Sequence, residues 1–532
     1  MPPLPQHLKL SRRMVLSAAP AGALAAPAAL AQQAPAAPPA RLEDMLQQFD
    51  RLAQDIMRRS GIPGMSIAVV HRDRLVYIKS FGVREAGKPA PVDPDTVFQL
   101  ASVSKPIAAT VIAALVGDGT VGWDDPVVRH DPGFEMHDPW VTREVTLRDM
   151  LAHRSGLPDH AGDMLEDLGY DRGQVLHRLR YQKPDSGFRA RYAYTNFGFT
   201  EAAVAAASAA GNSWEDLSAE RLYRPLGMAH ASSRFADFTA AANRVRGHVR
   251  IGGEWVAKYT RDPDAQSPAG GVSASVRDMA SWLRLQLAAG KFAGKQIIDA
   301  AALAETHRPQ IVRSPAKNPA IDHSGFYGLG WNIDYDPEGR VHWSHSGGFD
   351  LGAATSVSLL PAKELGIVAL TNAQPIGVPE AVAKSLFDLA LYGKVEKDWL
   401  TLYGELMTTV LAPGYTAIDY AKMPGQPSPA LPAAAYRGTY ENALYGPADV
   451  VDGDAGLVLK LGPRHRPYLL RHVDRDVFGY QPEGENAAGP SAVRFTIGID
   501  RRAEAVTIDN LDTNGQGTFR RAPTTEIRTD HG

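Results

Sequence analysis

A serine and a lysine three residues apart stand in front of a long apolar run. Ser102 and Lys105 lie in QLASVSKPIAATVIAAL, residues 99–115. In a helix, residues at i and i+3 share one face, and the unpaired N–H groups of a helix N-terminus favour a developing anion. A partly desolvated lysine at this point can take or relay the serine's proton. The pair therefore predicts a nucleophilic serine, with a helix cap beside a snorkelling lysine as the alternative.

Two residues farther along the chain offer partners for such a serine. Tyr194 and Asn196 stand in RYAYTNFGFTEAA, ahead of an Ala-rich helical pattern. A tyrosine hydroxyl near an ammonium group can pass a proton, and an asparagine amide can hold a substrate carbonyl. The alternative for Tyr194 is a core tyrosine, and Y-x-N recurs at 440–442. S-x-x-K recurs at 314–317, in a polar stretch that predicts a loop.

A third group, His345, Gly347 and Gly348, lies in VHWSHSGGFDLG. Paired glycines in a strand let a substrate backbone approach closely and leave an N–H free for an oxyanion. Another H-S-G, at 323–325, has no strand pattern of its own. His342 and His345 have no evident third ligand, and the chain lacks C-x2-C, H-E-x-x-H and Gly-rich phosphate-loop motifs. We therefore expect neither a metal nor a cofactor.

The elements that must position these residues combine strands at both ends of a region with helices between them. A helical stripe begins at Leu42, helical patterns dominate 105–235, and another helix covers 380–391. Strand patterns occur at 64–82, 327–334, 341–344 and 365–371. This order predicts an α/β (α+β) fold class, with one antiparallel sheet flanked by helices.

A different pattern follows a proline-rich linker at 424–432. Apolar residues alternate with polar ones at 457–462 and 493–500, which predicts a small all-β barrel or sandwich of about six to eight strands. The predicted segments are an export signal at 1–31, a tether at 32–40, the large domain at 41–400, a connection at 401–432, the β domain at 433–523 and a tail at 524–532.

Composition and the N-terminal segment indicate where the protein works. A net charge of −3 gives no reason to expect nucleic-acid or membrane-surface partners, and the absence of cysteine excludes disulfides. Arg12 and Arg13 precede an Ala-rich stretch that ends in Ala-Leu-Ala, which resembles a twin-arginine export signal. An ordinary secretory signal is the alternative, and either one predicts a periplasmic protein. No later stretch reaches the ~18 apolar residues of a membrane span.

The ordered motifs S-x-x-K, Y-x-N and H-x-G resemble those of the penicillin-recognising serine hydrolases. The similar branch holds class C β-lactamases, D-alanyl-D-alanine carboxypeptidases, D-aminopeptidases and esterases. Further similar stretches occur in the family's order: DTVFQLASVSKP, LRDMLAHRSGLPD, YTNFGF, SPAGGVSASVRDMASWL and YGLGW. The resemblance covers about residues 41–395, and the C-terminal part is similar to a lipocalin-like module found on some of these hydrolases.

The resemblance implies a role for each motif residue. Ser102 would be acylated, Lys105 would activate it, and Tyr194 would carry the proton to the leaving group. Asn196 would bind the acyl-side carbonyl, and the backbone N–H groups of Ser102 and Gly348 would form the oxyanion hole. Which of Lys105 and Tyr194 acts as the base stays open.

His345 departs from the β-lactamase pattern, which carries a lysine at this position. A neutral imidazole attracts a substrate carboxylate only weakly, which lowers the expectation of β-lactam substrates. We therefore expect a serine hydrolase that cleaves amide or peptide bonds of small substrates. A carboxylesterase or weak β-lactamase of the same fold is the first alternative, and a non-catalytic binding protein is the second. The sequence leaves the oligomeric state open.

Overall fold

The structure is a computed structural model that describes residues 42–410 and 424–523, together with 415, 418, 420 and 422. The predicted export signal, tether and tail lie outside the described residues. Within the described part, the chain divides into two compact units. The first holds the residues up to 134, 140–159 and 186–410, and the second holds 135–139, 160–185 and the C-terminal residues.

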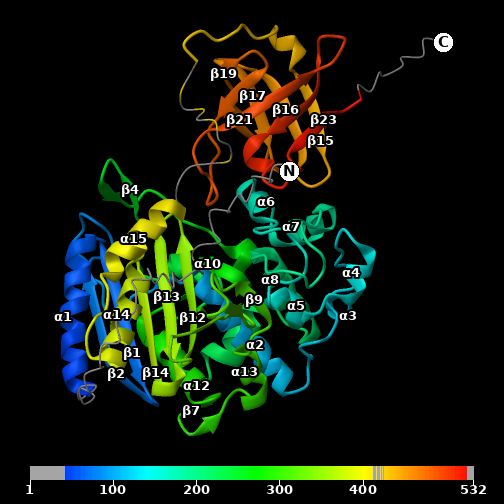
Figure 1. Ribbon diagram of the computed structural model, residues 1–532. Helices are drawn as coiled ribbons and strands as arrows, with labels where there is room; N and C mark the ends of the chain where they lie inside the picture. Colours follow the sequence, from blue (N-terminus) through cyan, green and yellow to red (C-terminus); the bar gives the residue numbers. More distant parts are fainter. Residues whose placement is uncertain are drawn as a thin grey trace. The chain divides into compact units, whose positions relative to one another are not determined.

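An eight-stranded antiparallel sheet forms the centre of the first unit (Figure 1), with the strand order β2-β1-β14-β13-β12-β11-β10-β9. Its strands are β1 Gly64–His71, β2 Arg74–Gly82, β9 Ile311–Ser314, β10 Gly325–Tyr327, β11 Asn332–Tyr335, β12 Val341–Phe349, β13 Ala353–Leu360 and β14 Leu365–Thr371. The predicted antiparallel sheet is confirmed. The stretch expected as one strand at 327–334 instead falls into β10, a turn and β11.

Helices cover both faces of this sheet. Leu365 and Ile367 of β14 point into a core that β1 shares with α1 and α14. Gly366 lies between these two residues and faces Leu283 of α12, so α12 covers the opposite face. The helices that accompany the sheet are α1 Leu42–Ser60, α2 Ser104–Gly117, α3 Val127–His130, α4 Pro139–Glu144, α5 Leu147–Leu151, α8 Asn196–Ala209, α9 Trp214–Ser218, α10 Phe235–Ala240, α11 Ser267–Gly270, α12 Val276–Leu287, α13 Ala300–Thr306, α14 Val378–Tyr392 and α15 Trp399–Val410.

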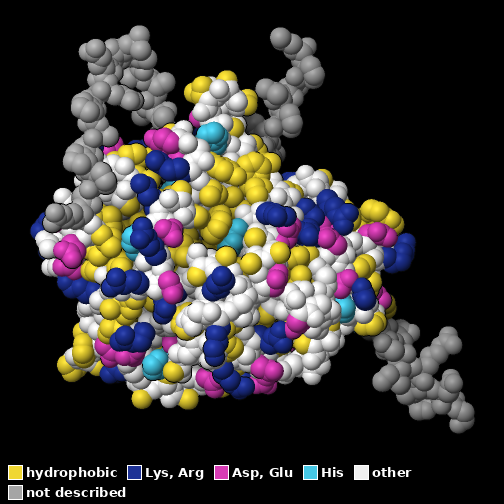
Figure 2. All heavy atoms as spheres, turned by 90° about the horizontal axis from the view of Figure 1, so that it is seen from below, with side chains coloured by type: hydrophobic (Ala, Val, Ile, Leu, Met, Phe, Trp, Pro, Cys, Tyr) yellow, Lys and Arg dark blue, Asp and Glu magenta, His cyan; other side chains and the backbone are white. Residues whose placement is uncertain are grey.

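Three short antiparallel pairs complete the first unit: β3 Phe98–Gln99 with β6 Ser273–Ala274, β4 Val249–Ile251 with β5 Glu254–Val256, and β7 Lys291–Phe292 with β8 Lys295–Gln296. The β3–β6 pair matters most for function, because β3 leads directly into the segment that carries Ser102. Figure 2 shows one face of the molecule, on which basic and acidic side chains are interspersed, in line with the net charge of −3.

The second unit contains a nine-stranded, nearly closed antiparallel sheet, one strand more than the expected upper limit. Its strands are β15 Gly438–Asn442, β16 Gly446–Gly453, β17 Gly456–Leu461, β18 Arg466–Leu469, β19 Arg471–Asp474, β20 Val477–Tyr480, β21 Ser491–Ile497, β22 Ala503–Ile508 and β23 Thr518–Arg521. Tyr436, Phe478 and Phe495 pack ring against ring inside it. Tyr440, which repeats the Y-x-N pattern, is a fully buried core residue whose hydroxyl donates to the carbonyl of Tyr436.

Two short helices, α6 (Asp163–Asp167) and α7 (Arg172–Arg178), also belong to the second unit, although they fall within residues 41–400. The Tyr170 hydroxyl donates to the carbonyl of Tyr445 at 2.9 Å. The Arg178 guanidinium donates to the carbonyls of Ala443 and Leu444. The loop before β16 is therefore held by a segment that precedes it in sequence by more than 260 residues.

Candidate active site

Ser102 occupies a sharp turn between β3 and α2. It lies in a single 3₁₀ turn, Ala101–Val103, and α2 begins two residues later at Ser104. Ala101 has a φ of +47°, in the left-handed region that an alanine enters only at a cost. The prediction that Ser102 and Lys105 share one helix is thus wrong in detail, since Ser102 precedes the helix. Their side chains still meet, with Lys105 Nζ 3.4 Å from Ser102 Oγ.

Lys105 is the centre of the site, and its side chain is completely buried. Its Nζ donates to Asn196 Oδ1 at 2.7 Å and to the carbonyl of Ala269 at 3.0 Å. The same atom lies 4.4 Å from the centre of the Tyr194 ring. The structure therefore brings Ser102, Lys105, Tyr194 and Asn196 together, although they come from segments 91 residues apart.

The Y-x-N segment is held at the start of α8 by contacts that the sequence reasoning did not assign. The Tyr194 backbone N–H donates to Asp159 Oδ1 at 2.9 Å, and the Thr195 N–H donates to His153 Nδ1 at 3.1 Å. The His153 ring lies 4.6 Å from the Tyr194 ring, centre to centre. Both His153 and Asp159 lie in LRDMLAHRSGLPD, one of the stretches that resemble the family.

His345 is buried on β12 and makes two hydrogen bonds. Its Nδ1 lies 2.7 Å from the Ser346 carbonyl, and its Nε2 lies 3.0 Å from the Tyr327 hydroxyl. Because a carbonyl only accepts, Nδ1 carries the proton, and the Tyr327 hydroxyl donates to Nε2. Burial, and then the charge of Lys105, lower the pKa of His345 to about 3. The imidazole is therefore neutral at physiological pH.

Tyr327 is a site residue that the sequence analysis did not identify, although YGLGW was one of the matching stretches. Its side chain is fully buried. Burial, and then the neighbouring Tyr192 and Tyr194, raise its pKa well above the usual value for tyrosine. Tyr327 thus remains a neutral hydroxyl and fixes the orientation of the His345 ring.

Gly347 brings β12 against the turn that carries Ser102. A Cβ at this position would lie 2.3 Å from the Leu100 carbonyl oxygen and 2.9 Å from the Ser102 backbone nitrogen. The Thr355 hydroxyl of β13, the register partner of Gly347, donates to the same Leu100 carbonyl at 2.7 Å. Gly348 follows in register with Ala354. Only glycine permits this approach, which places the end of β12 beside the nucleophile turn.

The Ser104 hydroxyl makes a structural hydrogen bond. This buried hydroxyl accepts a hydrogen bond from the Val272 N–H at 2.9 Å, so it joins the start of α2 to the segment before β6.

The second S-x-x-K, at 314–317, begins on the last residue of β9 and continues without helix. Among the described residues, no group of three or more acidic, histidine or cysteine side chains is arranged to hold a metal.

The site joins a half-buried serine hydroxyl to a buried amine, a tyrosine, an amide and a glycine-lined strand. This set of groups can activate a hydroxyl and bind an acyl carbonyl, which is the chemistry of a serine hydrolase. The fold and site thus define the class as serine hydrolases of the β-lactamase fold. Within the described part of the chain, no helix is both long enough and apolar enough to cross a bilayer.

Comparison with known families agrees with this class. The beta-lactamase family matches residues 49–390, and the chain belongs to this family. A domain of unknown function, DUF3471, matches residues 422–521. The predicted family and fold are therefore confirmed.

Individual relatives show how far the likeness extends. The chain is 26% identical to the unguisins hydrolase ungD of Aspergillus violaceofuscus, over 85% of this chain and 87% of the relative. It is 25% identical to the D-alanyl-D-alanine-carboxypeptidase/endopeptidase AmpH of Escherichia coli K12, over 62% of this chain and 84% of the relative.

Solved structures share the fold. An octameric penicillin-binding protein homologue from Pyrococcus abyssi superposes with a TM-score of 0.55 at 19% identity, covering 87% of this chain and 98% of its own. A class C beta lactamase from Rhodobacter sphaeroides superposes with a TM-score of 0.52 at 22% identity, covering 63% of this chain and 97% of its own.

Proposed function

We propose that the protein is an exported serine hydrolase that cleaves amide or peptide bonds of small substrates through an acyl-enzyme on Ser102. The observation that carries the proposal is the buried Lys105 amine, which contacts Ser102 and Asn196 and lies against the Tyr194 ring. No arrangement of this kind is needed for a helix cap, because a cap uses only the serine and backbone N–H groups.

The reaction runs in two balanced steps. The Ser102 hydroxyl gives its proton to the Lys105–Tyr194 pair while Oγ bonds to the acyl carbon, and the pair passes a proton to the departing amine. Water then attacks the ester, gives its proton to the pair, and Ser102 recovers a proton as the acid leaves. The N–H groups of Ser102 and Gly348 stabilise the oxyanion, and Asn196 binds the acyl-side carbonyl.

The neutral His345 supports amides and peptides over β-lactams. Its low pKa means that this position offers no positive charge to a substrate carboxylate near neutral pH. The name of AmpH, a carboxypeptidase/endopeptidase, agrees with peptide substrates. Carboxylester hydrolysis and weak β-lactam hydrolysis use the same groups and are the alternative activities.

Covalent labelling tests the nucleophile directly. A fluorophosphonate probe should modify Ser102 and no other serine, as read by peptide mass spectrometry, and Ser102→Ala should abolish labelling. Ser314→Ala is the matched control, because Ser314 begins the second S-x-x-K and should leave labelling unchanged. Folded protein that is never labelled would instead indicate a non-catalytic binding protein.

A substrate panel then separates the activities. Matched p-nitroanilides and p-nitrophenyl esters, in L and D forms, and a chromogenic cephalosporin are compared by kcat/KM. Amide preference is expected when each rate is divided by the uncatalysed rate of the same compound. An enzyme that accelerates only the esters or only the cephalosporin contradicts the amide assignment.

Export to the periplasm by the twin-arginine route is part of the proposal and rests on Arg12 and Arg13 with the Ala-rich stretch behind them. Replacing both arginines with lysine should trap the chain in the cytoplasm of a host that has the twin-arginine translocase. Export that continues in the double variant would indicate the ordinary secretory route.

A further inference from the structure

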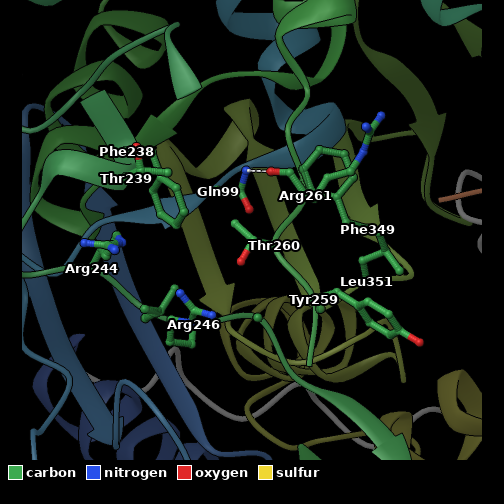
Figure 3. A pocket seen from close by; sticks show the side chains of 13 residues that line it. Gln99, Phe238, Thr239, Arg244, Arg246, Tyr259, Thr260, Arg261, Phe349 and Leu351 are labelled. Atoms are coloured by element: carbon green, nitrogen blue, oxygen red, sulfur yellow. Dashed lines mark hydrogen bonds between the residues drawn. The ribbon is translucent and has the colours of Figure 1, made fainter. Parts of the chain in front are cut away.

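A small cavity of about 30 Å³, partly open to solvent and with room for a small group such as a carboxylate, lies in the first unit at the far end of the strand that carries His345 (Figure 3). Its walls come from segments that are distant in sequence: 238–239, 244–247, 259–261, and Phe349 with Leu351 and Gly352. Gln99 of β3 closes one side, and its side chain donates to the Arg261 carbonyl at 2.9 Å. None of these residues has a part in the proposed bond cleavage.

The cavity adjoins the nucleophile turn. Phe349 lines the cavity and packs in one buried cluster with Ala101, the residue before Ser102. Phe349 is also four residues beyond His345 on β12, about 13 Å along an extended strand. Tyr194, which returns the proton to the leaving group in the proposed reaction, lies beside His345 in the middle of β12, with 6.4 Å between the two ring centres. With the leaving group beside Tyr194, the acyl part of a substrate would extend toward the Phe349 end of β12, where the cavity lies.

The charged side chains that line the cavity are all positive. Three arginines line the cavity, and no aspartate or glutamate does. Two of them are engaged by the protein: Arg244 donates to the Ala241 carbonyl, while Arg261 donates to the Asp262 carbonyl and lies over the Phe349 ring. The guanidinium of Arg246 has no hydrogen-bond or ion-pair partner among the described residues.

Figure 3 shows the Arg246 guanidinium directed toward Thr260, within the group of lining side chains, while that of Arg244 turns away. A guanidinium with its donors unsatisfied pairs best with a carboxylate, which can accept two parallel hydrogen bonds. Phe349 and Leu351 offer apolar surface beside it.

We propose that this cavity binds a carboxylate on the acyl side of the substrate and that Arg246 recognises it. The inference rests on the proposed hydrolase function and narrows its substrates to acidic acyl groups, such as a short peptide with a terminal or side-chain carboxylate. An acyl group two to three residues long spans about 7–10 Å when extended.

Direct binding tests the cavity without requiring turnover. The ligands are N-succinyl-alanine p-nitroanilide and its succinamoyl counterpart, in which an amide replaces the terminal carboxylate, each in D and L forms. Calorimetry on full-length Ser102→Ala protein should show that the acid of one stereochemical series binds at least tenfold more tightly. This preference should fall as salt concentration rises, because the guanidinium is half-exposed.

Three substitutions assign the preference to one side chain. Arg246→Gln should abolish the acid preference and leave affinity for the amide unchanged, while Arg246→Lys should keep part of it. Arg250→Ala is the matched control, since Arg250 is exposed, lies over the Trp255 ring and does not line the cavity. Thermal melts confirm that each variant is folded.

The outcomes separate this inference from the proposed function. Equal affinity for acid and amide in both stereochemical series, undetectable binding of all four ligands, or an acid preference that survives Arg246→Gln would each overturn the carboxylate site. A wild-type protein whose Ser102 never reacts with fluorophosphonate overturns the hydrolase assignment, whatever the binding experiment shows.

Discussion

Gly347→Ala is the sharpest test of how the site is built. The added Cβ would lie 2.3 Å from the Leu100 carbonyl oxygen, 2.5 Å from Thr355 Oγ1 and 2.9 Å from the Ser102 nitrogen. Ordinary contacts are about 3.5 Å, so β12 and the nucleophile turn must separate by about 1 Å. A misplacement of this size costs on the order of 10²-fold in rate. Overpacking adds a loss of about 1–3 kcal/mol in the free energy of unfolding.

The assay is the second-order rate constant for fluorophosphonate labelling of Ser102, with urea denaturation as the measure of stability. Gly366→Ala is the control, because Gly366 lies in the same sheet and its new Cβ would meet only leucine side chains at 3.5 Å. It should label at the wild-type rate. A Gly347→Ala protein that labels within threefold of wild type would refute the reasoning.

A double variant locates the clash. Two of the three atoms that the Gly347 Cβ meets belong to the backbone, and the third is the Thr355 hydroxyl. Adding Thr355→Ala removes that hydroxyl and leaves the backbone contacts in place. The double variant should therefore remain slow. Full recovery would show that only the Thr355 side chain was displaced.

Further predictions concern Ser102, Tyr327, His345 and His307. Ser102→Ala should abolish turnover with little change in melting, whereas a large loss of stability would favour the helix-cap alternative. Tyr327→Phe leaves His345 Nε2 without its donor and should cost about 1–3 kcal/mol in unfolding free energy; an unchanged urea midpoint contradicts this. With a pKa of about 3, His345 should give kcat/KM no inflection between pH 5 and 8, so an inflection that disappears in His345→Gln contradicts its neutrality. Burial lowers the pKa of His307 to about 3. As pH falls below about 6.5, His307 is therefore protonated in the unfolded state but not in the folded state. The free energy of unfolding then declines by about 1.4 kcal/mol per pH unit. His307→Phe should flatten this decline, and an equally steep decline in the variant would contradict the assignment.

Local patterns predicted the regular elements well where the periodicity was clear. The hairpin at 64–82 is β1 and β2, and the strand at 365–371 has the bounds of β14. The sequence AATSVSLL of β13 was not recognised, because the strand is buried along its whole length and small polar residues interrupt its apolar pattern. The strand β9 was missed because it has only four residues, of which three pair with β10.

The sequence predicted which residues form the site, but not the backbone conformation and side-chain contacts that arrange them. The order of the three motifs indicated that Ser102, Lys105 and Asn196 work together, and the structure brings them into contact. No local pattern could show that Ala101 adopts a left-handed conformation, since alanine gives no signal for it. Nor could spacing show that Tyr327 donates to His345, because that contact depends on how the central sheet folds.

The charges around the reaction centre suggest how the site chooses its substrates. In the β-lactamase pattern a lysine at the position of His345 provides a fixed positive charge, and here that position is neutral. The Arg246 guanidinium instead lines the cavity with Phe349, the last residue of β12. A carboxylate bound at Arg246 as proposed would place the scissile bond between the cavity and Tyr194, with the acyl group on the Arg246 side. Under the proposed function, a positive charge moved along the strand would change which part of an anionic substrate is recognised, while the serine, lysine and tyrosine would keep their chemistry.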